Sequence, residues 1–333
     1  MRSSRNFGPK RVIVHDAHIR ENAQKIAAYL AQHNCTMAIS TKSLPLEQGL
    51  LSIFTEKYPA YDLRADNLAV LTQAGHPTIS NLHLRGESHS IMLTDDDDIA
   101  YAPTGVQGYY LFFDFGDRRE GFVPEDVTRV ADALRGRGIT SVVLASNIGC
   151  LSDVPPTDEY FADFLTLRDA FSARGITVTK FSVGGSNCIP LIHTFASPVP
   201  TEIRAGEAIL FGTYANVDSD LLALNKENLF LEAWTLRTLG QDEIMFDFGY
   251  THAEQHELLP SACKIVRQSA NHSALALPAA TAPERILLPL HYRGLTKLSQ
   301  QRNVAFVRTS QSECNAQSTA RSATQLPVQQ AAT

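Results

Sequence analysis

Residues 181–212 read FSVGGSNCIPLIHTFASPVPTEIRAGEAILFG, and the fold of the chain is inferred from this stretch outward. Its β-prone beginning ends in Gly184-Gly185-Ser186, and the short run TEIR ends in Ala205-Gly206-Glu207. Small residues after a strand expose backbone N–H groups, and such amides can hold a phosphate without a lysine. Arg204 adds a fixed cation beside this cup. The same residues also fit two ordinary turns, with glycines at positive φ and a surface arginine.

Strand patterns alternate with helix patterns before this stretch. Apolar runs predict strands over residues 36–40, 60–65, 78–84, 90–94, 109–115, 141–146, 176–183 and 201–204. Helical patterns cover residues 17–33, 46–57, 66–74, 124–137 and 158–174. Such alternation is typical of parallel βαβ units, which bind ligands at the carboxyl ends of their strands. We therefore predict an α/β fold with a TIM-type (β/α) barrel.

Two connections within this pattern are short. These are the connections over residues 85–89 and 98–107. A crossover between parallel strands needs about a dozen residues, most of them helical. We expect reduced or missing helices on that side, which leaves open whether the barrel is complete.

The pattern changes after residue 223. Strands are predicted over residues 228–239, 243–248, 262–268 and 286–290, with no helices between them. We therefore divide the chain into a barrel domain, a smaller C-terminal β-rich domain and a disordered tail, over residues 11–225, 226–308 and 309–333. The strand at residues 11–15 can pair with the β-rich domain. The tail is rich in Ser, Gln, Ala and Thr, which cannot build a packed core.

Composition limits the classes of function. The chain has 333 residues, 44% of them hydrophobic, which is enough for a full barrel and a smaller module. A formal net charge of −6 gives no reason to expect nucleic acid or an anionic membrane as a partner. Five cysteines without a CxxC pair fit a reducing cytoplasm and no metal site. The acidic run Asp95–Asp98 fits a solvated loop or a helix start better than an ion site.

Polar residues follow the predicted strands at several places. Lys42 comes directly after a buried strand, where its charge needs a partner or a lowered pKa unless the side chain reaches the rim. Arg119 and Asn147 follow two later strands. Because the carboxyl ends of barrel strands meet at one mouth, these residues and the cup at 184–186 and 204–207 can lie together.

Four segments carry a resemblance to a known family. They are FDFGDRREGFVPED at residues 113–126, SNIGC at 146–150, SVGGSN at 182–187 and IRAGEAILFG at 203–212, with weaker matches around Lys42 and in LHYRGLTKL. With them the chain resembles the pyridoxal-phosphate-dependent alanine racemase superfamily of fold type III, most closely its ornithine racemase-like branch. The resemblance implies pyridoxal 5'-phosphate as cofactor and an amino-acid racemase that interconverts L- and D-amino acids.

The resemblance assigns roles to several residues. Lys42 corresponds to the lysine that holds the cofactor as a Schiff base and then removes the Cα proton. Arg204 matches the arginine that faces the pyridine nitrogen and disfavours its protonation. Arg119 matches an arginine that steadies the cofactor phenolate or the substrate carboxylate. Asn147 stands where alanine racemases have a ring-facing histidine. The phosphate cup corresponds to Gly184, Gly185 and Ser186 with Gly206 and Glu207.

The second acid/base is not identified by the resemblance. We cannot find the hairpin that supplies the opposite-face tyrosine, and FGYTH at residues 248–252 resembles the turn that lines a partner's substrate entrance. Tyr250 and His252 are candidates, against a structural aromatic and a surface histidine. Cys150 and Cys188 lie near the predicted mouth and are expected to be buried and structural. In the family two chains pack head to tail, so the resemblance implies a homodimer.

Three functions remain open at this point. A racemase needs acid/base groups on both faces of the cofactor. A pyridoxal-phosphate carrier without turnover is favoured by the short connections and the unidentified second base. A third choice is another reaction on the same scaffold, such as decarboxylation or aldol cleavage.

Overall fold

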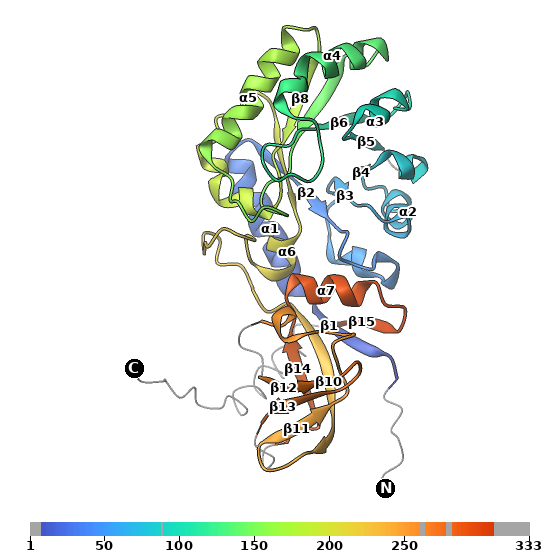
Figure 1. Ribbon diagram of the computed structural model, residues 1–333, viewed down its shortest axis with the longest axis vertical. Coiled ribbons are helices and arrows are strands. Elements are labelled where there is room, and N and C mark those ends of the chain that lie inside the picture. The colour runs from blue at the N-terminus through green and yellow to red at the C-terminus, as the bar shows by residue number, and fades with distance from the viewer. Residues whose placement is uncertain (1–7, 88, 260–263, 278–281, 310–333) are drawn as a thin grey trace. The chain divides into compact units, whose positions relative to one another are not determined.

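A computed structural model describes residues 8–87, 89–259, 264–277 and 282–309, so the predicted tail lies almost wholly outside the described residues. The chain divides into two compact units, coloured along the chain in Figure 1. We call Arg20–Lys226 the barrel unit, and Met1–Ile19 with Glu227–Thr333 the β unit. Within the described ranges, no helix is long and apolar enough to cross a membrane.

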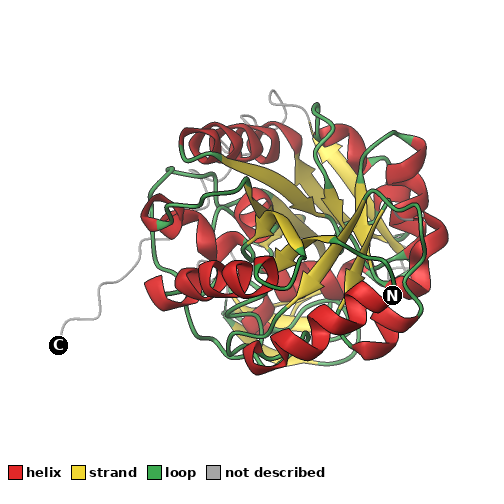
Figure 2. Cartoon of the chain, turned by 90° about the horizontal axis from the view of Figure 1, so that it is seen from above, coloured by secondary structure: helices red, strands yellow, loops and turns green. Residues whose placement is uncertain are grey.

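Eight parallel strands form the barrel. They are β2 (Cys35–Ser40), β3 (Ala60–Tyr61), β4 (Thr78–Ser80), β5 (Ser90–Leu93), β6 (Gly108–Phe112), β7 (Ser141–Ala145), β8 (Thr177–Ser182) and β9 (Thr201–Ala205). β9 pairs with β2, which closes the barrel, and Figure 2 shows the helices around its strands. An incomplete barrel is therefore excluded.

The helices on the short side are reduced, as predicted. β4 and β5 are joined by a 3₁₀ segment, Leu82–Glu87, and β5 is followed by the five-residue helix α3 (Asp96–Ala100). Asp95 caps α3, so the acidic run begins a helix. The barrel still closes because closure depends on the strand ladder, and β4 pairs with β5 as β5 pairs with β6. A crossover with one helical turn is long enough to connect such short strands.

The other helices up to residue 211 include four that were predicted, over residues 17–33, 66–74, 124–137 and 158–174, and one that was not, over residues 207–211. They are α1 (Asp16–Gln32), α2 (Ala65–Gln73), α4 (Val127–Gly136), α5 (Asp158–Ser172) and α6 (Glu207–Phe211), with 3₁₀ segments at Leu46–Gln48, Leu50–Ile53, Pro124–Asp126 and Ser186–Thr194. The helix predicted over residues 46–57 is wrong. Gly49 adopts φ +80° between two 3₁₀ segments, and a left-handed residue ends a right-handed helix. The strand predicted over residues 78–84 is also too long, since its second half is 3₁₀.

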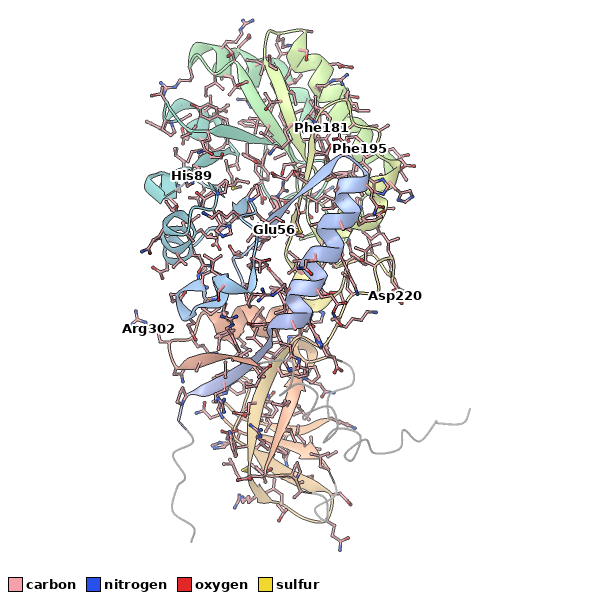
Figure 3. All side chains as sticks on the ribbon, turned by 180° about the vertical axis from the view of Figure 1, so that it is seen from behind. Glu56, His89, Phe181, Phe195, Asp220 and Arg302 are labelled. Atoms are coloured by element: carbon pink, nitrogen blue, oxygen red, sulfur yellow. The ribbon has the colours of Figure 1, made fainter. Side chains whose placement is uncertain are left out.

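The side chains that the barrel strands direct outward and inward have different environments. Outward, Phe181 packs against Phe195 and Phe164 of α5, with ring centroids 5.8 and 5.4 Å away (Figure 3). Inward, the strands β3 to β7 contribute one buried apolar cluster: Tyr61, Ile79, Met92, Tyr110, Phe112, Val143 and Ala145. β8 and β9 instead contribute Lys180, Ser182, Glu202 and Arg204. One side of the barrel interior is therefore apolar and the other polar.

The β unit contains a seven-stranded sheet. Its strands are β1 (Lys10–His15), β10 (Leu229–Thr238), β11 (Glu243–Phe246), β12 (Ile265–Gln268), β13 (Ser273–Ala276), β14 (Arg285–Pro289) and β15 (Val304–Thr309). β1 lies between β10 and β15, antiparallel to the first and parallel to the second. The helix α7 (Tyr292–Ser299), β13 and β15 were not predicted. The closed barrel and the separate β-rich sheet confirm the predicted fold class.

Candidate active site

Lys42 lies two residues beyond β2, in a loop that buried polar side chains hold. The Asn67 amide donates to the carbonyl oxygens of Thr41 and Leu44, at 3.3 and 2.8 Å, and its oxygen accepts from the N–H of Leu46 at 3.1 Å. Asn67 and Thr41 are both fully buried. One asparagine therefore fixes both ends of the loop that carries Lys42. We call residues 41–46 the lysine loop.

A buried carboxylate completes this arrangement. Asp62 follows β3 and accepts hydrogen bonds from the Thr41 hydroxyl at 2.5 Å, the Asn67 amide at 2.8 Å and the N–H of Arg64 at 2.8 Å. Burial raises the pKa of Asp62, and the hydrogen bonds from Thr41 and Asn67 act in the opposite direction. Asp62 therefore links the ends of β2 and β3 beside the lysine.

The Lys42 amine has the electrostatic setting of a nucleophile or base. Burial lowers its pKa; Cys150 and Glu120 oppose the change, while Arg119 and Arg204 lower the pKa further. An amine with a lowered pKa is deprotonated more often near neutral pH, which imine formation and proton abstraction both require. Lys42 and Arg119 follow β2 and β6, and Arg204 lies near the end of β9, so all three lie at the same mouth of the barrel, where their charges act on one another.

Arg204 is fixed at the mouth by oxygen atoms at the end of β8 and just after β7. One guanidinium nitrogen donates to the Ser182 hydroxyl and, at 3.0 Å, to the Ser182 carbonyl. The other donates to the Ser146 carbonyl at 2.5 Å and to the Asn147 side chain at 2.8 Å. The guanidinium carbon also lies 5.7 Å from the ring centre of Tyr61. Arg204 is 4% exposed, so it is a rigid buried cation.

Asn147 connects Arg204 to the second arginine. Its amide nitrogen donates to Glu120, whose carboxylate also accepts two hydrogen bonds from Arg119. Glu120 raises the pKa of Arg119 against the opposing effect of burial, so Arg119 keeps its charge. The planar guanidinium is held in one orientation by this bidentate contact. The structure thus joins three residues that were predicted separately.

The two glycine-containing strand ends form one rigid pair of turns. The Arg204 N–H donates to the Gly184 carbonyl at 2.9 Å, and the Ser186 hydroxyl accepts from the Gly206 N–H at 3.3 Å. Gly184 has φ +108°, and a Cβ there would lie 2.8 Å from the Cys188 sulfur. The Glu207 side chain turns to Thr213, which donates to it at 2.8 Å, so only the backbone of Glu207 belongs to the cup.

Gly185 differs from the other glycines of the cup. Its φ is negative, and the nearest atoms to a Cβ would be at 3.7 and 3.9 Å, an ordinary contact distance. The packing of the chain does not require glycine here, whereas a ligand that approaches the backbone closely does. This open side fits a phosphate group beside the turn pair.

The loop after β7 is attached to the loop after β6. Asp117 accepts hydrogen bonds from the N–H groups of Cys150, Leu151 and Ser152 at 3.0–3.1 Å. Burial raises its pKa, but the hydrogen bonds outweigh burial, and the net pKa of Asp117 is lowered. Cys150 is exposed, which corrects the expectation that it is buried, whereas Cys188 is buried as expected. Both cysteines, like Cys35, are free thiols.

Tyr250 and His252 belong to the β unit, in the turn after β11. A Cβ on Gly249 would lie 2.2 Å from the Ser269 carbonyl, so glycine is required where the turn touches the backbone. Tyr250 follows with 49% of its surface exposed. His252 is 6% exposed and is not the expected surface histidine. Burial and then Lys10 lower its pKa to about 4, so its ring is neutral at pH 7.

Five polar residues near the mouth were missed in the sequence: Tyr61, Asp62, Asn67, Glu120 and Glu202. Two had a usable signal. Glu202 and Arg204 are two positions apart on one strand and therefore share a face. Glu120 directly follows the predicted Arg119. Asp62 was hidden because the run over residues 60–65 predicts one strand. Asn67 lies in the predicted helix over residues 66–74, where the pattern gives no sign of its contacts with the lysine loop.

The residues present fit pyridoxal 5'-phosphate, the cofactor implied by the sequence resemblance. Lys42 would supply the amine, the turn pair with the open side of Gly185 would hold the phosphate, and Arg204 would adjoin the ring. Among the described residues, no three His, Cys, Asp or Glu side chains form a group that could hold a metal ion.

Comparisons with known proteins agree with this geometry. Residues 97–214 match the model of the family "Alanine racemase, N-terminal domain". No curated protein sequence matches the chain. The ornithine racemase-like branch is not specified by these matches.

Solved structures match over almost the whole chain. The D-threonine aldolase of Filomicrobium marinum has 16% identity and a TM-score of 0.64, covering 90% of this chain and 93% of its own. The alanine racemase of Corynebacterium glutamicum has 8% identity and a TM-score of 0.69, covering 91% and 100%. The D-threo-3-hydroxyaspartate dehydratase of Delftia sp. HT23 has 14% identity and a TM-score of 0.65, covering 89% and 93%. The chain thus has the fold of the alanine racemases, and its resemblance to that superfamily is confirmed.

Proposed function

We propose that the protein is a pyridoxal-phosphate-dependent amino-acid racemase. The observation that carries the proposal is the position of Lys42: a lysine whose pKa is lowered lies at the barrel mouth, among the groups that interact with Arg119 and Arg204. The family match over residues 97–214 and the open backbone at Gly185 support the same cofactor. When bound, the cofactor delocalises the negative charge that forms at the substrate Cα.

The residues of the chain then divide the remaining tasks. Lys42 takes the proton from one face of Cα as a free amine. Arg119, oriented by Glu120, offers its planar fork to the substrate carboxylate or to the cofactor oxygen. The cup holds the phosphate, and Arg204 keeps a cation beside the ring. The acid/base for the opposite face is assigned to Tyr250, whose ring is half exposed, in a homodimer that shares its sites.

The test is exchange of the Cα hydrogen in deuterium oxide. A panel of L- and D-amino acids is incubated with the cofactor-loaded protein, and deuterium content and chirality are measured together. We expect deuterium in both enantiomers of at least one amino acid. Exchange that retains configuration would mean a single working base. No exchange at all, with the cofactor bound, would instead support the carrier without turnover.

A second candidate is cleavage or elimination of a β-hydroxy amino acid. Similarity in fold to a D-threonine aldolase and a D-threo-3-hydroxyaspartate dehydratase favours it. The panel therefore includes D-threonine and D-threo-3-hydroxyaspartate, with assays for released aldehyde and ammonia. Release faster than racemisation of any other substrate would make this reaction the function. We place the enzyme in the cytoplasm as part of the proposal, because its free thiols suit a reducing compartment.

A further inference from the structure

The polar side of the barrel interior contains a fully buried carboxylate, Glu202. Glu202 is 0% exposed and accepts three hydrogen bonds. The donors are the Ser182 hydroxyl at 3.0 Å, the Lys180 amine at 3.1 Å and the Tyr110 hydroxyl at 3.3 Å. Burial and then Glu202 raise the pKa of Tyr110, so that Tyr110 stays protonated as a donor. Such a donor set suits an ionised carboxylate.

Ser182 connects this carboxylate to Arg204. Its hydroxyl donates to Glu202 and accepts from the Arg204 guanidinium. A hydroxyl group has one hydrogen, and the carboxylate attracts it, which leaves the oxygen lone pairs directed to the arginine. Glu202 therefore sets the direction of the hydroxyl that Arg204 requires.

On the side of Arg204 away from Ser182, a neutral side chain again separates the arginine from a carboxylate. Asn147 accepts from Arg204 and donates to Glu120, which is paired with Arg119. A single chain of contacts results, in which charges alternate and neutral groups separate Arg204 from each carboxylate: Arg119, Glu120, Asn147, Arg204, Ser182, Glu202 and Lys180. Within the described residues, these four hydrogen bonds of the Arg204 guanidinium all go to uncharged oxygens.

This order has an electrostatic consequence. A carboxylate in direct contact would cancel the field of the arginine, whereas one placed behind a hydroxyl offsets only part of it. A buried cation with no carboxylate nearby would be costly. The arrangement therefore keeps Arg204 buried, oriented and positively charged towards the mouth.

We propose that Glu202 is a positioning residue, which orients Arg204 through Ser182 and partly offsets its charge from inside the barrel. Lys180, the partner of Glu202 and 30% exposed at its side chain, weakens that offset in turn. The inference deepens the proposed function, because there Arg204 adjoins the cofactor. Its test does not depend on catalysis.

The measured quantity is the pKa of Lys42 in the full-length, cofactor-free protein. It is obtained from the pH dependence of acylation by acetic anhydride, with the modified peptide quantified by mass spectrometry. Cys150, Arg119, Glu120 and Arg204 are the charged or titratable groups with the largest effects on this amine, and Glu202 and Lys180 stand behind Arg204. Two variants change the charge behind Arg204 in opposite directions, namely Glu202→Gln and Lys180→Gln.

Glu202→Gln keeps an acceptor for Ser182 and removes the anion. We expect the pKa of Lys42 to fall by about half a unit, since a cation near Arg204 becomes less favourable. Lys180→Gln should raise the pKa of Lys42 by a smaller amount, because Glu202 then offsets more of the positive charge of Arg204. Glu202→Asp keeps the charge with a shorter reach and should restore part of the fall. If Glu202 had a purely structural role, the pKa of Lys42 would not shift in opposite directions in Glu202→Gln and Lys180→Gln.

A matched control exists in the β unit. Glu232 is 1% exposed and paired with Arg11 and Arg285, so Glu232→Gln also removes a buried, ion-paired carboxylate. It should lower thermal stability and leave the pKa of Lys42 unchanged. The inference is overturned if Glu202→Gln is folded with an unchanged pKa, or if both charge variants shift it in the same direction. If Glu202→Gln does not fold, Lys180→Gln is the deciding variant. A pKa of Lys42 that does not rise in Lys180→Gln would then reject the inference.

The wild-type protein separates this inference from the proposed function. Its affinity for pyridoxal 5'-phosphate is measured by equilibrium dialysis in the same preparation. Absence of binding would refute the proposed function while the Lys42 measurement still decides the role of Glu202. Binding with no response to either charge variant would reject only the positioning role.

Discussion

The lowered pKa of Lys42 comes from burial and from neighbouring charges, and not from its position after a strand alone. A lysine that merely reached the rim would keep its ordinary charge, whereas burial, Arg119 and Arg204 lower the pKa of this one. The sequence predicts a special lysine but not the cause. The two arginines reach it from loops and strands more than 75 residues away along the chain.

Lys42 should be the residue that holds the cofactor. Borohydride reduction of the loaded protein should fix a pyridoxyl group on the peptide that contains Lys42. Lys42→Ala should abolish this label and the racemase activity. Lys25→Ala removes a lysine paired with Glu21 on α1 and should change neither. A label on another peptide would refute the assignment.

Arg204 should not tolerate even a lysine. One ammonium group cannot bond the Ser182 and Ser146 carbonyls together, as the two guanidinium nitrogens do. Arg204→Lys should lower the free energy of unfolding by about 1–3 kcal/mol, because a buried acceptor loses its donor. Urea titration measures this change. Arg129→Lys, at an arginine 49% exposed at its side chain, should stay within about 0.5 kcal/mol of wild type. Equal losses in both variants would contradict this account of Arg204.

At the scale of elements, the barrel mouth is assembled by side chains that tie one strand end to the next. Asn67 and Asp62 join the lysine loop to β3, and Asp117 joins the loops after β6 and β7. These residues bind no ligand in the proposed mechanism. They matter because the position of a loop is only as defined as its hydrogen bonds.

Removal of Asn67 should loosen the lysine loop. Asn67→Ala leaves the Leu46 N–H and the Thr41 and Leu44 carbonyls without this partner, at a cost of about 2–4 kcal/mol in unfolding free energy. Thermal unfolding and hydrogen exchange over residues 41–46 measure the change. Asn303→Ala, at an exposed residue, is the control. Unchanged exchange in the lysine loop would show that Asn67 does not hold it.

Asp117 should make the mouth sensitive to acid. Its pKa is lowered in the folded chain, so its stabilisation is fully present above the unfolded pKa, about 4. The stabilisation is lost as the pH falls through the lower, folded pKa. The gap in melting temperature between wild type and Asp117→Asn should therefore narrow below about pH 4. If the difference in melting temperature stays constant from pH 6 to pH 2, the stabilisation does not come from the Asp117 carboxylate. Asp132→Asn, on the exposed face of α4, controls for general charge effects.

The sequence predicted long barrel strands better than short ones. β6 and β7 are continuous apolar runs, and such runs predict buried strands. β3 has only two residues, so its pattern could not be separated from Asp62, and the buried carboxylate was missed. In the β unit, β13 was missed because SALA has weak strand propensity, and its pairing with β11 and β12 decides its conformation.

At the scale of the whole molecule, the proposed racemase is incomplete as one chain. The acid/base that we assign to the second face is Tyr250, in the β unit, and the family resemblance implies that it serves a partner's barrel. A homodimer with twofold symmetry would then contain two shared sites. Sedimentation at micromolar concentration should show a dimer.

Complementation tests the shared site directly. Lys42→Ala and Tyr250→Phe should each be inactive alone. Unfolded and refolded together, they should recover about a quarter of wild-type activity, since half the dimers are mixed and each has one intact site. Lys42→Ala mixed with itself is the control. Recovery no greater than that of either parent would remove Tyr250 from a shared site.

The sequence predicted a barrel but left its closure open, because closure depends on pairing between distant strands. Short connections suggested a gap, yet β2 and β9, whose paired residues are 166 positions apart, form the ladder that closes the ring. The residues that the motifs from 113 to 212 propose for the site do lie at or after strand ends, since that relation is local. Relations between strands far apart in the chain leave no local trace, and the hydrogen bond from Tyr110 to Glu202, 92 residues away, is an example.

The position of β1 bears on how the protein is made. β1 precedes the barrel strands in the chain, yet it lies between β10 and β15, and its register pairs Lys10 with Val304. Val12 and Val14, both fully buried in the finished sheet, must therefore remain unpaired on the ribosome while the entire barrel unit is synthesised. The barrel can fold early during translation, but the β unit can be completed only as the last strand leaves the exit tunnel. Premature termination after residue 226 would release a complete ring of strands together with an orphan strand ready to pair with another chain.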